Sequence, residues 1–76
     1  MIRVQLYRRS RAVLDELTSS DAAANALIDA TIDAVHHGRH GEGCFRLNAD
    51  RVTPDGLFMG VFWSSPVFHH PVPISA

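Results

Sequence analysis

The sequence predicts a small two-layer α+β domain, with one main helix on one face of a three-stranded, antiparallel-type sheet in the order β-α-β-β. Three patterns support this class. Residues 2–7 alternate apolar and polar side chains, residues 21–37 repeat apolar side chains at helical spacing, and residues 45–65 place two runs of strand formers around a turn sequence, TPDG. A helix and a sheet that each have one apolar face bury those faces against each other.

The first predicted strand, residues 2–7, turns Ile2, Val4 and Leu6 toward a core, because successive strand side chains point to opposite faces. In the segment that follows, Val13 and Leu17 are spaced as on a helix. Residues 10–18 are therefore predicted to contain a short helical turn.

The main helix is predicted over residues 21–37. Ser20 is suited to cap its N-terminus, Asp21 lies favourably in its first turn, and Gly38 is the natural residue beyond its C-terminus. Its apolar side chains recur on one face, which predicts a buried stripe. This stripe consists of Ala24, Leu27, Ile28, Thr31, Ile32 and Val35.

The turn sequence predicts a β-hairpin with a loop of Pro54, Asp55 and Gly56, because proline presets the first corner and glycine accepts a positive φ. Thr53 then faces Leu57, and this register gives one clean apolar face. The face consists of Phe45, Leu47, Ala49, Leu57, Met59, Val61 and Trp63. Its inner part, Leu47, Val61 and Trp63, is expected to join the first strand against the helix. Residues 1–65 then form one domain, and the proline-spaced residues 66–76 form an extended tail or arm.

Composition limits the classes of function. The single cysteine, Cys44, excludes an internal disulfide and indicates a reducing cytoplasm. The net charge of -1 argues against strong electrostatic binding to duplex DNA, and no apolar run is long enough for a membrane span. All seven basic residues are arginine, which suggests a GC-rich bacterial or phage genome. No cofactor motif is present, so no cofactor is expected.

The predicted sheet has a second face that no element covers. It carries aromatic and arginine side chains, which are typical interface anchors. The expected partner-binding residues are Phe58, Phe62, Tyr7, Arg46 and Arg3. A small two-layer domain gains core by pairing, so a homodimer is the first expected occupant and a different partner protein the second.

Two alternatives use other residues. Arg8, Arg9 and Arg11 are candidates for an anion or nucleic-acid site, which would extend the same face to a single-stranded nucleic acid, although a solvated basic edge is the favoured interpretation of these residues. The other alternative is a metal-supported domain that uses the histidine clusters, with His36, His40 and Cys44 as weak candidates for metal ligands.

Catalysis is not expected, because cysteine–histidine and aspartate–histidine pairs arise by chance at this composition and a domain of this size has little room for a deep pocket. The sequence thus predicts a small non-catalytic protein-interaction or inhibitor-type module.

Overall fold

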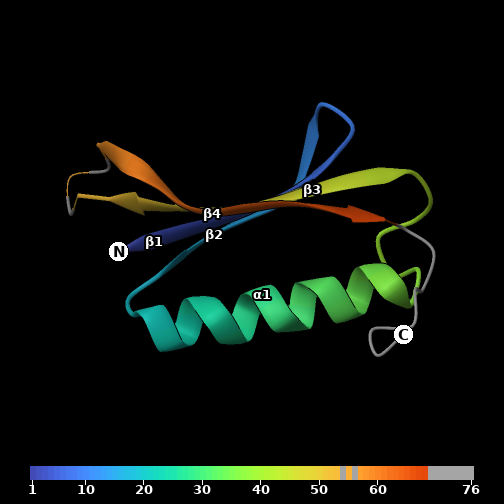
Figure 1. Cartoon of the computed structure of the whole chain (residues 1–76), viewed down its shortest axis with the longest axis horizontal. Coiled ribbons are helices and arrows are strands. Elements are labelled where there is room, and N and C mark those ends of the chain that lie inside the picture. The colour runs from blue at the N-terminus through green and yellow to red at the C-terminus, as the bar shows by residue number, and fades with distance from the viewer. Residues whose placement is uncertain (54, 56, 69–76) are drawn as a thin grey trace.

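The computed structural model describes residues 1–53, 55 and 57–68, in which one helix packs on one face of a four-stranded antiparallel sheet (Figure 1). Residues 54, 56 and 69–76 lie outside the described part, as do the side chains of residues 58, 59 and 68. The elements are β1 (Ile2–Arg8), β2 (Arg11–Thr18), α1 (Asp21–His36), β3 (Cys44–Val52) and β4 (Phe58–Phe68). The predicted α+β class is confirmed. The prediction of three strands is wrong, because the sheet has four strands, in the spatial order β2-β1-β3-β4.

The additional strand, β2, replaces the helical turn predicted within residues 10–18. It pairs with β1 from Ile2 opposite Thr18 to Arg8 opposite Arg11, leaving a connection of only Arg9 and Ser10. Tight hairpin turns need a positive φ, which glycine and asparagine usually supply. Here Arg9 adopts φ 59°, so the turn has no sequence signal of its own.

The helix follows the sequence prediction closely. The Ala23 amide donates a hydrogen bond of 3.1 Å to Ser20 Oγ, which confirms the N-cap. Gly38 follows the C-cap residue His37 with φ 72°, and its amide donates to the Val35 carbonyl at 3.0 Å. This is the left-handed position that glycine accepts without a Cβ clash.

The register of the β3–β4 hairpin differs from the predicted one. It begins as expected, because the Thr53 amide donates to the Leu57 carbonyl at 2.8 Å, but two irregularities then shift the pairing. Val52 pairs with Phe58 and Ala49 pairs with Trp63, so Met59 and Phe62 are the extra residues of two β-bulges. The turn residues 54 and 56 themselves lie outside the described part.

The bulges reassign the side chains of β4. Phe62 and Trp63 both pack against the core, whereas Val61 is 64% exposed. The prediction that Val61 is in the core is therefore wrong, and so is the prediction of Leu57, which is 65% exposed. The bulge puts Phe62 in place of Val61 beside Trp63, and a phenylalanine side chain buries more apolar surface than a valine, which favours the bulged arrangement.

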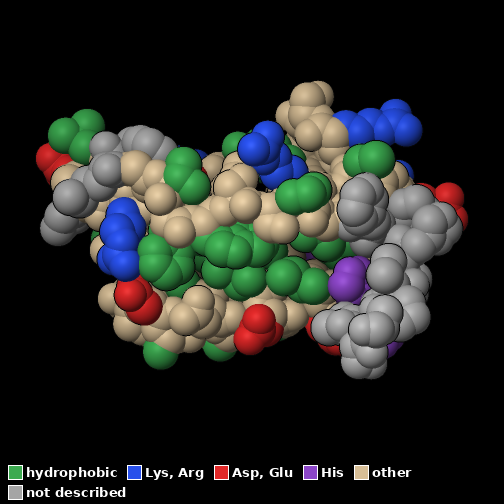
Figure 2. All heavy atoms as spheres, viewed as in Figure 1, with side chains coloured by type: hydrophobic (Ala, Val, Ile, Leu, Met, Phe, Trp, Pro, Cys, Tyr) green, Lys and Arg blue, Asp and Glu red, His purple; other side chains and the backbone are tan. Residues whose placement is uncertain are grey.

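The core lies between the sheet and α1, where hydrophobic side chains gather in one continuous layer (Figure 2). The predicted strand residues Ile2, Val4, Leu6 and Leu47 are at most 1% exposed. Partly buried Leu14, Leu27 and Ile32 pack against this layer. Its buried members also include Ala24, Ile28, Thr31, Val35, Phe45, Ala49 and Val67.

Strand β4 continues to Phe68, past the predicted end of the domain at residue 65. Pro66 pairs opposite Arg46 and Val67 is buried. Proline is tolerated here because β4 is an edge strand, whose outer side needs no amide donor. The remainder of the predicted tail, residues 69–76, lies outside the described part.

Candidate functional site: the open sheet face

The face of the sheet opposite α1 is covered by no element among the described residues (Figure 1). Strand pairing arranges its side chains in rows that run from β2 through β1 and β3 to β4. The three rows are Leu17–Arg3–Asp50–Val61, Asp15–Gln5–Asn48–Ser64 and Ala12–Tyr7–Arg46–Pro66. The centre of this face is therefore polar, with exposed Leu17 and Val61 at its two borders.

One ion pair on this face is internally satisfied. Arg3 donates to Asp15 through two hydrogen bonds, from Nε to Oδ1 at 2.9 Å and from Nη2 to Oδ2 at 2.6 Å. Gln5 adds a bond of 3.3 Å from Nε2 to Asp15 Oδ2. The hydrogen bonds from Arg3 hold the pKa of Asp15 below its usual value.

Asp50 has a different environment. It is 8% exposed, and burial raises the pKa of its carboxyl group despite the nearby Arg3 charge. Among the described residues, no group donates a hydrogen bond to this carboxylate. Asp50 is therefore a nearly buried acid that retains hydrogen-bonding capacity toward the open face.

A shallow groove crosses the open face beside the β1–β2 turn; we call it the open-face groove. Within it, Ser64 Oγ donates to Asn48 Oδ1 at 2.8 Å and accepts a bond of 3.3 Å from Arg46 Nε. These bonds hold the middle of the groove in one arrangement. The groove is lined by Tyr7, Arg9, Ser10, Arg46, Asn48, Asp50, Val61 and Ser64.

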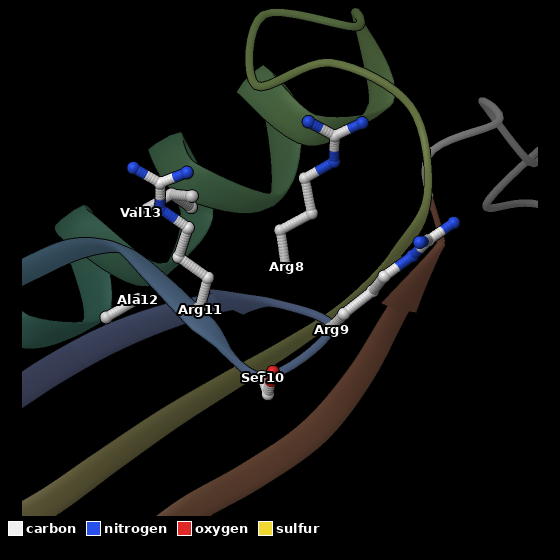
Figure 3. A pocket seen from close by; sticks show the side chains of 6 residues that line it. All are labelled: Arg8, Arg9, Ser10, Arg11, Ala12 and Val13. Carbon is white, nitrogen blue, oxygen red and sulfur yellow. The ribbon is translucent and has the colours of Figure 1, made fainter.

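The β1–β2 turn carries three more arginines around a second hollow (Figure 3). Arg8 and Arg11 extend in the same general direction from facing strand positions, whereas Arg9 extends away from them. Arg8 Nε donates to the Glu42 carbonyl at 2.5 Å, and its guanidinium lies against Gly41, where an added Cβ would be only 3.2 Å from Nη1. Arg8 therefore fixes the loop that precedes β3.

The arginines separate into paired and unpaired groups. Arg3 pairs with Asp15, and Arg51 pairs with Asp21 at 3.2 Å. Across the described ranges, the other five of the seven arginines form no ion pair. Of these five, Arg9 and Arg46 line the open-face groove.

The structure brings part of the predicted binding surface together. Arg3, Tyr7 and Arg46 lie on the open face as expected. Phe62 does not, because its ring packs against the core and lies 4.7 Å below the Arg51 guanidinium carbon on the α1 side. The predicted anchor Phe58 lies outside the described side chains.

Sequence reasoning missed the role of Asp50 and Val61 in the groove. The alternation of side chains along β3 puts Asp50 on the same face as Arg46, but nothing in the sequence indicates that Asp50 is buried. Val61 was assigned to the core by a register that lacked the bulges.

The predicted metal ligands do not form a cluster. Within the part of the chain that is described, no three histidine, cysteine or acidic side chains gather as a metal ion would require, so His36, His40 and Cys44 are not brought together as a site. Cys44 is an exposed free thiol. The one described helix is too short and too polar to cross a lipid bilayer.

Comparison of the chain with protein-family models, curated proteins and solved structures gave no match.

Proposed function

We propose that this chain is a small, non-catalytic module that docks a partner protein on its open sheet face. The observation that supports this most directly is that one complete face of the four-stranded sheet lacks a covering element among the described residues and displays a groove of polar groups with spare bonding capacity. Surfaces that combine arginine, tyrosine and a few exposed apolar residues are typical of non-obligate interfaces.

A different protein fits this face better than a second copy of the chain. Two identical faces stacked on each other would bury the Arg3–Asp15 pair of each copy, whose charges are already matched and gain no new partner. Burying charges without new partners costs several kcal/mol per ion, which opposes a self-complementary interface here. The homodimer expected from an aromatic face also loses Phe62 as an anchor, because that ring lies in the core.

Single-stranded nucleic acid is the second candidate. It is favoured by the arginines at the β1–β2 turn that form no ion pair with any described residue, together with Tyr7 as a stacking platform. It is opposed by Asp50 and Asp15 on the same face, because carboxylates repel phosphates, and by the net charge of -1. Filter binding with an oligothymidylate at low and high salt tests this candidate, since phosphate contacts weaken steeply with salt.

The groove supports binding rather than catalysis. It contains two serines, Ser10 and Ser64; Ser64 is engaged by Asn48 and Arg46, and no described residue that lines the groove is a histidine. An activated nucleophile requires a base within hydrogen-bond reach. The exposed free thiol of Cys44 suits a reducing compartment, which supports our proposal of a cytoplasmic location.

The docking proposal can be tested with two matched surface variants. Val61 borders the groove and is 64% exposed, whereas Leu57 lies at the β3–β4 turn and is 65% exposed. Each is replaced by aspartate, and the native chain and both variants are used for proximity labelling in the cells that express the protein.

We expect one or more proteins to be labelled by the native chain and by Leu57→Asp but not by Val61→Asp. Purified candidates are then titrated with all three chains, with light scattering to record the mass of the chain alone. Equal binding of all three to every candidate would refute docking on this face. A stable dimer lost only in Val61→Asp would instead identify a second copy as the occupant.

A further inference from the structure

The open-face groove has a positive end and a negative end. Arg46 and Asp50 both lie on β3 and line the groove, four positions apart on the same face. At the rise of a β-strand this corresponds to roughly 13 Å. Arg9, at the β1–β2 turn, also lines the groove and adds a second guanidinium, whereas Asp50 is the groove's one acidic residue among those described.

Neither end is satisfied within the described part of the chain. Arg46 uses Nε for a single bond of 3.3 Å to Ser64, which leaves its two terminal amino groups without a described acceptor. Arg9 forms no described ion pair, and Asp50 accepts no described hydrogen bond. The Arg3–Asp15 pair on the same face shows the contrast, since both of its charges are matched.

We propose that the groove binds an extended segment of the partner protein in which an acidic residue and a basic residue are separated by four positions. The acidic side chain pairs with Arg46 and Arg9, and the basic side chain donates to Asp50. An extended segment along β3 has the same rise per residue as β3 itself, so the two spacings match without strain. This inference rests on the proposed docking function and specifies its ligand chemistry.

A mixed-charge peptide fits this pattern better than a polyanion. A phosphate chain that follows the groove from Arg46 would meet the nearly buried carboxylate of Asp50. Unpaired like charges at close range are a strong element of discrimination between partners. Arginine also matches carboxylate geometry with two parallel bonds, which its free terminal amino groups permit.

The test is a double-mutant cycle with short peptides. Blocked peptides with the sequences ETVTK and KTVTE cover both chain directions, and matched peptides replace the lysine by glutamine. Each is titrated at up to millimolar concentration into the isotopically labelled native chain, and the amide shifts of the groove residues give Kd. The protein variants are Asp50→Asn and Arg46→Gln. Arg39→Gln serves as control, because Arg39 is an exposed arginine in the loop after α1.

On the native chain and on the Arg39→Gln control we expect lysine to improve Kd by about fivefold over glutamine, near the upper end for exposed ion pairs. On Asp50→Asn this preference should fall below about twofold, and Arg46→Gln should weaken both peptides while the lysine preference persists. An equal preference on the native chain and Asp50→Asn, shifts outside the groove, or no shifts at millimolar peptide would each overturn the proposal. Oligothymidylate binding that depends on Arg46 and exceeds peptide binding would replace it with the nucleic-acid candidate.

Failure of this cycle can be distinguished from failure of the docking function. A partner lost only in Val61→Asp together with a flat peptide cycle would leave the face correct and the ligand chemistry wrong. If Val61→Asp binds every partner as well as the native chain does, both the docking function and the proposed ligand chemistry are refuted.

Discussion

Truncating either Phe62 or Val61 on β4 to alanine tests the bulged register directly. Phe62 is half-buried against the core and lies under Arg51, whereas its neighbour Val61 is 64% exposed on the other face. In a hairpin without bulges these roles reverse. Phe62→Ala and Val61→Ala therefore have opposite expected costs in the two registers.

The magnitudes follow from burial. Truncating a fully buried phenylalanine costs about 3–5 kcal/mol, so a half-buried ring costs about 1.5–2.5. Loss of the exposed cation–π contact with Arg51 adds about 0.5–1, which gives about 2–3.5 kcal/mol for Phe62→Ala. Val61→Ala should stay within about 0.5 kcal/mol, as is usual for exposed positions. A chain of 76 residues has a total stability of about 4–11 kcal/mol, so both variants should remain folded.

Urea unfolding followed by the fluorescence of Trp63, the single tryptophan, and by circular dichroism measures both free energies. In thermal unfolding we expect the Phe62 variant to melt roughly 10–20 °C below the native chain, and the Val61 variant to melt close to the native temperature. A Val61→Ala cost above about 1.5 kcal/mol together with a nearly neutral Phe62→Ala would refute the bulged register. In that case Phe62 would lie on the open face, and the centre of that face would not be polar.

Three further predictions concern single residues. Because burial raises the pKa of Asp50, its carboxyl group favours the folded state at low pH, and this contribution is lost as the pH rises through the folded pKa. Asp50→Asn should therefore stabilise the protein at pH 7 and have less effect as the pH falls toward 4. A constant difference between the melting temperatures of the two chains over this range would count against the prediction. At Arg9, with φ 59°, glycine should stabilise the fold by about 0.5–1 kcal/mol and valine should destabilise it by about 1–2 in urea titrations, and equal effects would contradict strain at this turn. Ser20→Ala should cost about 1 kcal/mol by the same titration, with the exposed Ser19→Ala as the neutral control.

The helix could be predicted from the sequence because its determinants are local. Ser20 at the N-cap, the apolar stripe and Gly38 after the C-cap all lie within one contiguous segment. For the same reason the predicted core residues of the first strand are buried, and those of the helix are buried or partly buried. Only the spacing of apolar side chains within each element was needed to assign them.

The first hairpin could not be predicted because its turn breaks the usual preference. A positive φ at Arg9 is an exception among non-glycine residues, and the sequence therefore lacks the glycine or asparagine that would announce a two-residue turn. The helical turn predicted within residues 10–18 gives Asp15 no position beside Arg3. The satisfied ion pair of the open face was lost with the strand that carries it.

The bulge at Phe62 connects the error in the fold to the error in the site. Strict alternation along β4 gave a self-consistent apolar face, so the sequence contained no local conflict that would have indicated an extra residue. The bulge turns two consecutive aromatic side chains into the core and leaves Val61 on the open face. The same irregularity thus enlarges a small core and removes an aromatic anchor from the docking surface. The partner that we propose for this face would be recognised by Arg46, Arg9 and Asp50, so we expect matched charge to decide binding more than apolar area does.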